Sequence, residues 1–381
     1  MSAPGRAPAL SSADVAYARL ACLPGMTPRR LRVLLERWPD PHDALAAVRA
    51  GRAVAVLLAQ EEPQPRLFDA RRVGELTRAW SEAAAFDLTP MLWARRTRVF
   101  VDGRPDYPIA DEVPGRPPVL LAEGDGPDAL TRPRVAIVGT RAASVHGLLD
   151  ARDLGAFLAR NNVTVVSGLA IGIDGAAHEG AIDAGGGAIG VVATGLDVVY
   201  PRRHVVLHDR VRRHGLLVSE LPFGTGPHRS RFPVRNRIIA GVADVVVLIE
   251  ATATGGARIT ADFALEYGRS VLVVPGSRRN PAAAGCNALL ADGAHPLLDP
   301  ADVLLALGLA PTGARGWGAP SPRPVPGGDA PAVLQACRGE AATADQLAAR
   351  TGLPPERVAR AAADLERSGW LRRDRGYLWP S

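Results

Sequence analysis

Six short apolar runs recur between residues 131 and 309, and helical patterns separate them. The runs are residues 134–139, 163–167, 188–194, 216–221, 245–250 and 271–275. They are continuously apolar rather than alternating, which is typical of strands buried on both faces of a parallel sheet. The helical patterns cover residues 144–160, 174–184, 203–214, 233–242, 257–268 and 285–292. This order predicts an α/β domain with an extended, doubly wound, Rossmann-like parallel sheet.

Two other regions flank this sheet domain, which we place at residues 81–309. Residues 1–80 predict a helical domain, in which LACLPGMTPRRLRVLLERW is similar to a helix-hairpin-helix or SAM-like unit. Such a hairpin either holds a DNA phosphate through its backbone or serves packing alone. Residues 310–330 form a Pro/Gly linker. Residues 331–381 predict three short helices and a hairpin, the pattern of a winged helix that contacts DNA or protein.

Composition excludes several classes of protein. Apolar residues make up 47% of the 381 residues, which argues against global disorder. Three cysteines lie far apart, so no disulfide framework is expected and a reducing cytoplasm fits. No apolar run resembles a signal peptide or is long enough to span a bilayer, so no membrane partner is expected.

Basic charge is concentrated in one segment of the predicted sheet domain. The chain carries 45 arginines, no lysine and 39 acidic residues, for a net charge of +6. Residues 202–237 alone hold nine arginines and two acidic residues, a net charge of +7. This basic band is either a solvated helix face or a surface for polyphosphate or nucleic acid.

Polar and glycine-rich turns follow the first two predicted strands. The first strand runs into Gly139, Thr140 and Arg141, and Ser144 is expected to cap the next helix. The second strand runs into a loop whose candidate residues are Ser167, Gly168 and Asp174. Glycine lets the backbone approach a phosphate, and a helix N-terminus favours the negative charge. Asp174 has a second interpretation as the cap of the next helix.

A further glycine-rich turn, Gly255–Gly256, follows the fifth predicted strand. Ligands of open α/β sheets bind at the carboxyl ends of the strands, so we expect these turns to line one crevice. The chain has no GxGxxG motif and no P-loop lysine, which excludes an ordinary dinucleotide pocket and a P-loop hydrolase. His204 and His208 are spaced i, i+4, but no third ligand in helix register follows and no nucleophile elbow is present. No metal, cofactor or catalytic residue is therefore expected.

The start of the helix predicted at 233–242 carries the most informative cluster. Its candidate site residues are Phe232, Arg235, Asn236 and Arg237. Arginine forks bind successive phosphates, and an aromatic ring supports a stacked base. The alternative is a salt-bridged helix start with Phe232 in the core.

These motifs, in this order, resemble the DNA-processing protein A (DprA/Smf) family. The matching runs include VAIVGTRAAS, VSGLAIGIDGAAHEGAIDAGG, FPVRNRIIAGVAD and GCNALLADGA, and the resemblance covers about residues 105–305. It implies a Rossmann-like domain that binds single-stranded DNA, usually as a homodimer. It also implies loading of the RecA recombinase onto DNA taken up in natural transformation.

The chain departs from the pattern of this family at three places. Many members have Arg or Lys at Ile171, and many have Asn at His204. The common Gly-Ser-Leu-Ile-Thr-Ala turn reads Gly-Ala-Arg-Ile-Thr-Ala at residues 256–261, which removes a hydroxyl and adds Arg258.

We therefore expect a cytoplasmic, non-enzymatic protein that binds and protects single-stranded DNA and acts with RecA. Two alternatives stay open. One is a nucleotide-processing enzyme similar to phosphoribohydrolases, with Asp262 as the surviving carboxylate. The other is a regulator that reads duplex DNA through the winged helix.

Overall fold

The computed structural model describes residues 10–60, 70–309, 326–337, 341–374 and 376–380. The chain divides into two units, Met1–Trp317 and Gly318–Ser381. The finer limits expected from the sequence, at residues 80, 309 and 330, stay predictions. Within the described residues, no helix is both long and apolar enough to cross a membrane.

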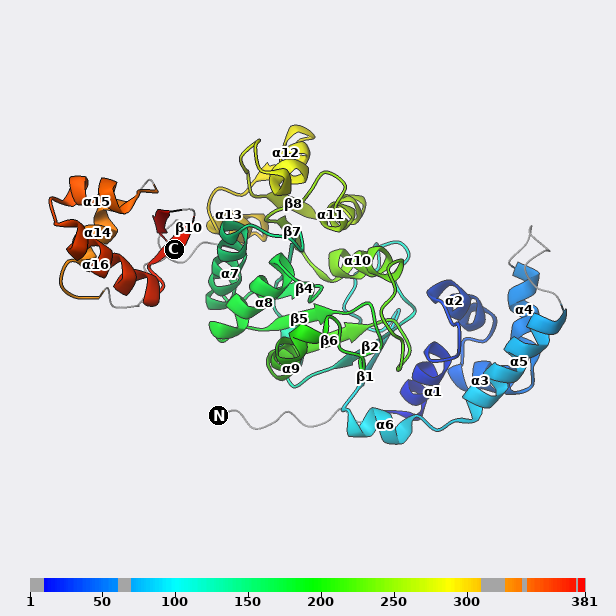
Figure 1. Ribbon diagram of the computed structural model, residues 1–381. Coiled ribbons are helices and arrows are strands. Elements are labelled where there is room, and N and C mark those ends of the chain that lie inside the picture. Colours follow the sequence, from blue (N-terminus) through cyan, green and yellow to red (C-terminus); the bar gives the residue numbers. More distant parts are fainter. Residues whose placement is uncertain (1–9, 61–69, 310–325, 338–340, 375, 381) are drawn as a thin grey trace. The chain divides into compact units, whose positions relative to one another are not determined.

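A nine-stranded sheet lies at the centre of the larger unit (Figure 1). Its strand order is β1-β2-β6-β5-β4-β3-β7-β8-β9. The strands are Arg98–Val101 (β1), Val119–Glu123 (β2), Arg134–Val138 (β3), Thr164–Ser167 (β4), Ala188–Val191 (β5), Gly215–Ser219 (β6), Val245–Leu248 (β7), Ser270–Val273 (β8) and His295–Pro296 (β9). The six predicted strands are β3 to β8, and all of them pair in parallel. The predicted doubly wound sheet is therefore confirmed.

Three strands were not predicted. Strands β1 and β2 form an antiparallel hairpin that extends the sheet through an antiparallel pairing of β2 with β6. Both strands lie before residue 131, outside the region in which strand and helix patterns alternate. Strand β9 is only two residues long and pairs in parallel with β8.

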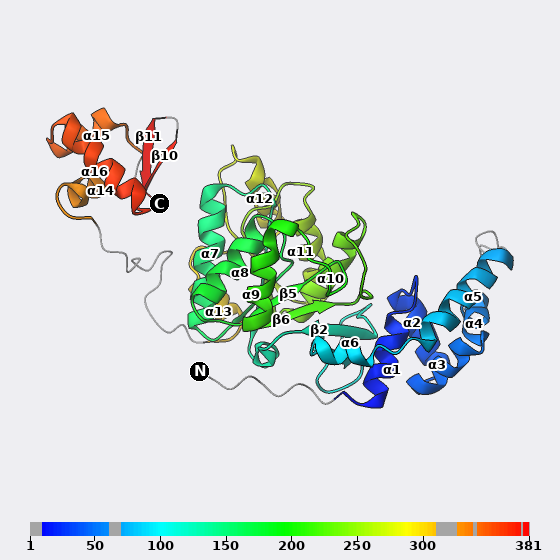
Figure 2. The same ribbon diagram turned by 60° about the horizontal axis from the view of Figure 1, so that its bottom comes forward.

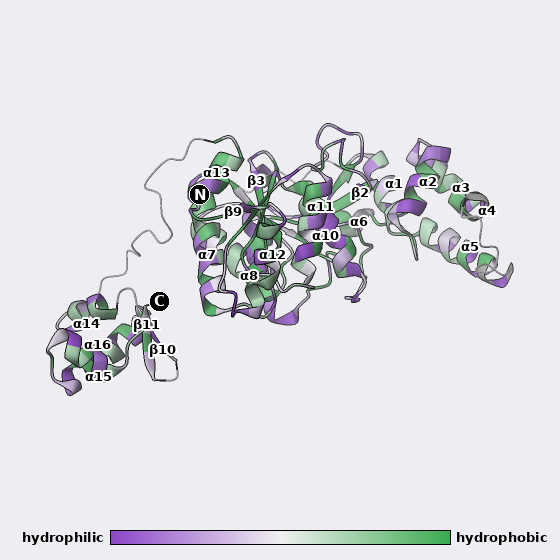
Figure 3. Ribbon diagram, turned by 90° about the horizontal axis from the view of Figure 1, so that it is seen from above, coloured by the Kyte–Doolittle hydropathy of each residue, from purple (hydrophilic) through white to green (hydrophobic). Residues whose placement is uncertain are grey.

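Helices cover both faces of the sheet. They are Val145–Arg160 (α7), Ile173–Asp183 (α8), Val205–His214 (α9), Arg231–Val242 (α10), Gly256–Glu266 (α11), Ala284–Ala291 (α12) and Ala301–Ala306 (α13), with short 3₁₀ helices at Pro127–Leu130 (η1), Arg202–His204 (η2) and Pro281–Ala283 (η3). Val135 and Ile137 of β3 pack with α7 and α8, whereas Ala136 and Val138 pack with α10 and α11. The central strands are correspondingly hydrophobic in Figure 3. Alternate residues of one strand thus bury two separate cores.

Within the described residues, six helices precede the sheet, and Figure 2 shows them beside it. They are Ser12–Ala21 (α1), Pro28–Arg37 (α2), Pro41–Arg49 (α3), Arg52–Gln60 (α4), Ala70–Ala85 (α5) and Thr89–Ala94 (α6). The predicted hairpin joins α1 to α2, with Gly25 at a φ of 66° and Thr27 as the N-cap of α2. The indole of the fully buried Trp80 donates a 2.7 Å hydrogen bond to the carbonyl of Pro24. This hairpin therefore takes part in packing the helical region.

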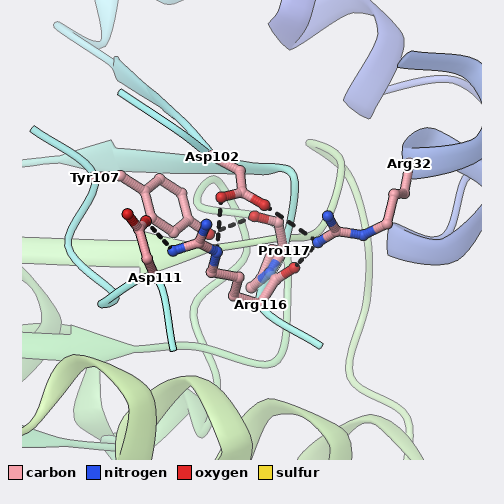
Figure 4. A network of polar contacts seen from close by, with 6 residues as sticks. All are labelled: Arg32, Asp102, Tyr107, Asp111, Arg116 and Pro117. Carbon is pink, nitrogen blue, oxygen red and sulfur yellow. Dashed lines mark hydrogen bonds and ion pairs between the residues drawn. The ribbon is translucent and has the colours of Figure 1, made fainter. Parts of the chain in front are cut away.

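A polar network joins these helices to the β1–β2 connection (Figure 4). Arg32 of α2 donates to the carboxylate of Asp102 at 3.2 Å and to the carbonyl of Arg116 at 2.6 Å. The Arg116 guanidinium in turn pairs with Asp102 at 2.7 Å and with Asp111 at 2.5 Å. The N-terminal helices are thus tied to the edge of the sheet by shared ion pairs.

The second unit has the architecture of a winged helix, as predicted. Its elements are Ala330–Cys337 (α14), Ala344–Thr351 (α15), Pro355–Arg367 (α16), Leu371–Asp374 (β10) and Tyr377–Pro380 (β11). Thr343 forms a capping box with Gln346 at the start of α15. Most of the predicted linker, residues 310–325, lies outside the described residues, and α14 starts at the last residue of that linker.

Candidate nucleic-acid interface

A cleft of about 640 Å³ lies at the carboxyl edge of the sheet, beyond the ends of β3, β4 and β7. Parallel strands bring their carboxyl ends to one edge, which explains why turns far apart in the sequence meet there. Nine of the thirteen predicted site residues line it: Gly139, Thr140, Arg141, Asp174, Phe232, Arg235, Asn236, Gly255 and Gly256. Tyr200 and Arg229 also line the cleft, although neither was among the predicted site residues.

One wall of the cleft combines a cation with two aromatic rings. Arg141 is exposed, and its guanidinium carbon lies 5.0 Å from the centroid of the Phe232 ring. The ring centroids of Phe232 and Tyr200 are 5.4 Å apart and tilted by 43°. The same three residues border an adjoining apolar recess of about 20 Å³, and Ile171 also lines it. Ile171 thus contributes an apolar side chain to this recess, which leaves Arg141 as the cationic residue of its lining.

Arg235 lines the cleft, but almost all of its side chain is buried. Its Nη1 donates to the carbonyl of Gly168 at 2.9 Å and also to the carbonyl of Val191. Burial lowers the pKa of Arg235 to about 10, although nearby Asp174 opposes this shift. The sequence predicts that this guanidinium binds successive phosphates. In the structure its Nη1 instead joins the ends of β4 and β5 through the carbonyls of Gly168 and Val191.

The loop after β4 is held by its own polar groups. Asp174 accepts a 3.0 Å hydrogen bond from the backbone N–H of Gly168, and the hydroxyl of Ser167 donates to the carbonyl of Ile137 at 2.6 Å. The interpretation of Asp174 as the helix cap is wrong, because Gly172 is the N-cap of α8. Burial raises the pKa of Asp174, whereas Arg235 lowers it. Ser167 and Gly168 therefore hold this loop in place. Neither lines the cleft, and Gly168 borders the adjoining recess.

Glu250 occupies the N-terminus of α7. Its carboxylate accepts the backbone N–H of Ser144 at 2.8 Å and the hydroxyl of Ser144 at 2.6 Å. Asn280 donates to the same carboxylate at 3.1 Å. The prediction that Ser144 caps α7 is confirmed by its 3.0 Å bond from the N–H of Gly147. Ser144 is also a candidate phosphate-binding residue from its sequence position. Its hydroxyl donates to the internal carboxylate of Glu250 instead of an external phosphate.

The remaining predicted residues join helices and turns. Asn236 donates to the carbonyl of Gly256 at 3.0 Å, which ties α10 to the turn before α11. Arg237 forms an ion pair with Glu220, and both side chains are largely buried. Arg237 does not line the cleft, so its charge is neutralised beside the cleft rather than in it.

The arginines of the basic band at residues 202–237 differ in their partners: some form ion pairs, and one lines the cleft. Arg210 pairs with Asp183, and both Arg212 and Arg213 pair with Asp209. Arg229 is exposed and lines the cleft. The net charge of the segment therefore overstates the charge that it directs at the cleft.

Comparison with known proteins identifies the family. Residues 98–308 match the family model described as DNA recombination-mediator protein A, and residues 318–376 match the DprA winged helix domain. The chain belongs to the DNA recombination-mediator protein A family. This membership confirms the resemblance inferred from the sequence, and the matched range contains every residue that lines the cleft.

Individual relatives agree with this assignment. The chain is 41% identical over 211 residues to Protein Smf of Synechocystis sp., a match that covers 54% of this chain and 53% of that protein. It is 36% identical over 272 residues to Protein Smf of Escherichia coli, covering 67% and 72%. The solved structure of DNA processing protein A from Streptococcus pneumoniae is similar with a TM-score of 0.60 and 31% identity, covering 76% of this chain and 97% of that one. The chain thus spans about half the length of the Synechocystis relative.

Proposed function

We propose that this protein binds single-stranded DNA in the cleft at the carboxyl edge of its sheet. The observation that carries the proposal is the placement of Arg141 against Phe232, with Tyr200 beside it, in one open cleft. Aromatic faces stack on bases of any sequence, and a guanidinium holds the phosphate between them. Together they favour a nucleic acid whose bases are unpaired.

Two helix N-termini at the cleft supply further phosphate donors. Helix α10 begins beside Phe232 and helix α11 begins at Gly256, and neither has a side-chain cap. The first N–H groups of such helices lack partners within the helix and favour an anion. By contrast, α7 is capped by Ser144, which Glu250 holds. These differences support a strand that runs past α10 and α11.

Family membership supports a role in the processing of DNA. We infer that the protein acts in the cytoplasm during natural transformation, where it protects incoming strands, works as a homodimer and loads RecA. In this proposal the protein needs no cofactor and catalyses no reaction. The support is the resemblance of residues 105–305 together with the family match.

The alternative of a phosphoribohydrolase-like enzyme depended on Asp262. That carboxylate is exposed on α11 and is not among the residues that line the cleft. A general acid or base must reach its substrate, so this placement does not favour the enzyme.

Binding of a single strand and of a duplex of equal length, measured by fluorescence anisotropy with the full chain, tests the proposal. We expect tighter binding to the single strand, with an affinity that falls as salt rises. Tighter binding to the duplex would contradict the proposal, and loss of that duplex binding on deletion of residues 331–381 would favour the winged-helix regulator.

A further inference from the structure

Two consecutive arginines stand on the loop that follows β8. Arg278 and Arg279 are both exposed. Within the part of the chain that the structure describes, neither guanidinium has a recorded hydrogen bond or ion pair. This differs from Arg210, Arg212 and Arg237 of the basic band, which pair with carboxylates.

The loop that carries these arginines is fixed at both ends. At one end, Asn287 donates to the carbonyl of Gly276 at 3.0 Å and accepts the N–H of Gly276 at 3.2 Å. At the other end, Asn280 donates to Glu250 at 3.1 Å and accepts the N–H of Ala282 at 3.0 Å. Arg278 and Arg279 therefore lie on a loop whose two ends are held by hydrogen bonds, and we call it the braced loop. Because its backbone is restrained, less entropy is lost when the two arginines bind a ligand.

The braced loop adjoins the cleft along the same edge of the sheet. Strand β7 lies between β3 and β8, and at about 4.8 Å per strand β8 lies roughly 10 Å from β3. The residues after β7, Ala251 and Thr252, line the cleft. Gly285 of α12 donates to the carbonyl of Ala251 at 2.7 Å, so the chain after the loop packs directly against this lining. The loop is thus connected to the part of the cleft that Ala251 and Thr252 line.

Two carboxylates near this loop already have partners. Glu250 accepts hydrogen bonds from Asn280 of the loop and from Ser144. Asp292 at the end of α12 forms a 3.2 Å ion pair with Arg258 of α11. Arg258 is the residue by which this chain departs from the common turn of the family. Within the described residues, neither Glu250 nor Asp292 forms an ion pair with Arg278 or Arg279.

We propose that Arg278 and Arg279 form a second phosphate-binding station for the single strand held in the cleft. The inference rests on the proposed function, because it extends the path of the same strand. Arginine forks match phosphate geometry, and each phosphate neutralised on a single strand adds about 0.7 to the salt slope. Because the two arginines lie outside the cleft, we expect them to strengthen the binding only of strands long enough to reach them.

Oligothymidylates of increasing length, titrated at several salt concentrations against the full chain, test this station. In the R278A/R279A variant we expect several-fold weaker binding of long strands and a salt slope smaller by about 1.4. Short strands should bind as they do to the unsubstituted protein. R141A should weaken short and long strands alike, because it removes a contact in the cleft itself.

Arg160→Ala is the matched control. Arg160 is exposed at the end of α7, on the opposite edge of the sheet, so this variant should bind every strand normally. Unchanged length dependence and salt slope in R278A/R279A, with R141A weakened, would overturn the second station alone. Failure of the unsubstituted protein to bind any single strand would overturn the proposed function as well. Thermal unfolding of each variant checks that the fold is retained.

Discussion

The guanidinium of Arg141 lies 5.0 Å from the centre of the Phe232 ring, although one residue follows β3 and the other begins α10. A solvent-exposed contact between a cation and an aromatic face stabilises the pair by about 0.5–1 kcal/mol. The contact therefore holds the charge of Arg141 at the wall of the cleft instead of leaving it free in solvent. A phosphate and an adjoining base could then be bound by neighbouring groups.

Removing the charge of Arg141 should weaken binding of single-stranded DNA and reduce its dependence on salt. For R141A we expect the slope of log affinity against log salt to fall by about 0.7, the value for one phosphate contact. R141K should keep the slope but bind less tightly, because lysine lacks the planar fork that lies over Phe232. Anisotropy titrations at several salt concentrations measure both quantities. An unchanged slope in R141A would remove Arg141 from the interface.

Removing the Phe232 ring should weaken binding without changing the salt slope. We expect F232A to lose about 1–3 kcal/mol of binding free energy for one stacked base. Phe232→Tyr should bind nearly as well, whereas Phe232→Leu keeps apolar volume without a ring face and should resemble F232A. If Phe232→Leu binds as tightly as the unsubstituted protein, the ring serves packing and not stacking.

Adding a methyl group at Gly168 should destabilise the fold under the cleft. A Cβ there would lie 2.4 Å from Nη1 of the buried Arg235 side chain. We expect Gly168→Ala to lower the free energy of unfolding by about 1–3 kcal/mol, as for other overpacked sites. The matched control is Gly226→Ala, since a Cβ there meets no atom within 4 Å. Denaturant unfolding should separate the two variants, and equal stability would show that Arg235 can move aside.

Asp150 of α7 gives a prediction about pH. Burial raises its pKa to about 6, and the carboxylates of Asp153 and Glu250 add to this while His146 opposes it. An acid whose pKa is raised in the folded state holds its proton more tightly there than in the unfolded chain. Its contribution to stability is therefore lost as pH rises from about 4 to about 6.

Asp150→Asn should remove the loss of stability that Asp150 causes as pH rises. We expect this variant to match the unsubstituted protein near pH 4 and to have the higher Tm above pH 6. Thermal unfolding across this range provides the measurement. A Tm difference that does not change with pH would show that Asp150 does not titrate in this window.

The sequence predicted the parallel sheet because its strands are continuous apolar runs, and it predicted the position of the cleft because parallel strands share a carboxyl edge. It did not predict the orientation of individual side chains. Glu250 reaches Ser144 from a distant part of the chain, and Glu220 takes up Arg237. Arg235 turns inward because Gly168 leaves room for it. These side-chain orientations depend on packing between elements, which a local sequence pattern does not determine.

Photocrosslinking tests the central claim, that a single strand lies in the cleft, most directly. A strand carrying photoreactive thymidine analogues is irradiated with the full chain, and the attached residues are mapped by mass spectrometry. We expect crosslinks at Phe232 and Tyr200, which fall to background when Arg141 is replaced by Ala at high salt. Crosslinks confined to the winged helix, residues 331–381, or to the N-terminal helices would contradict binding in the cleft.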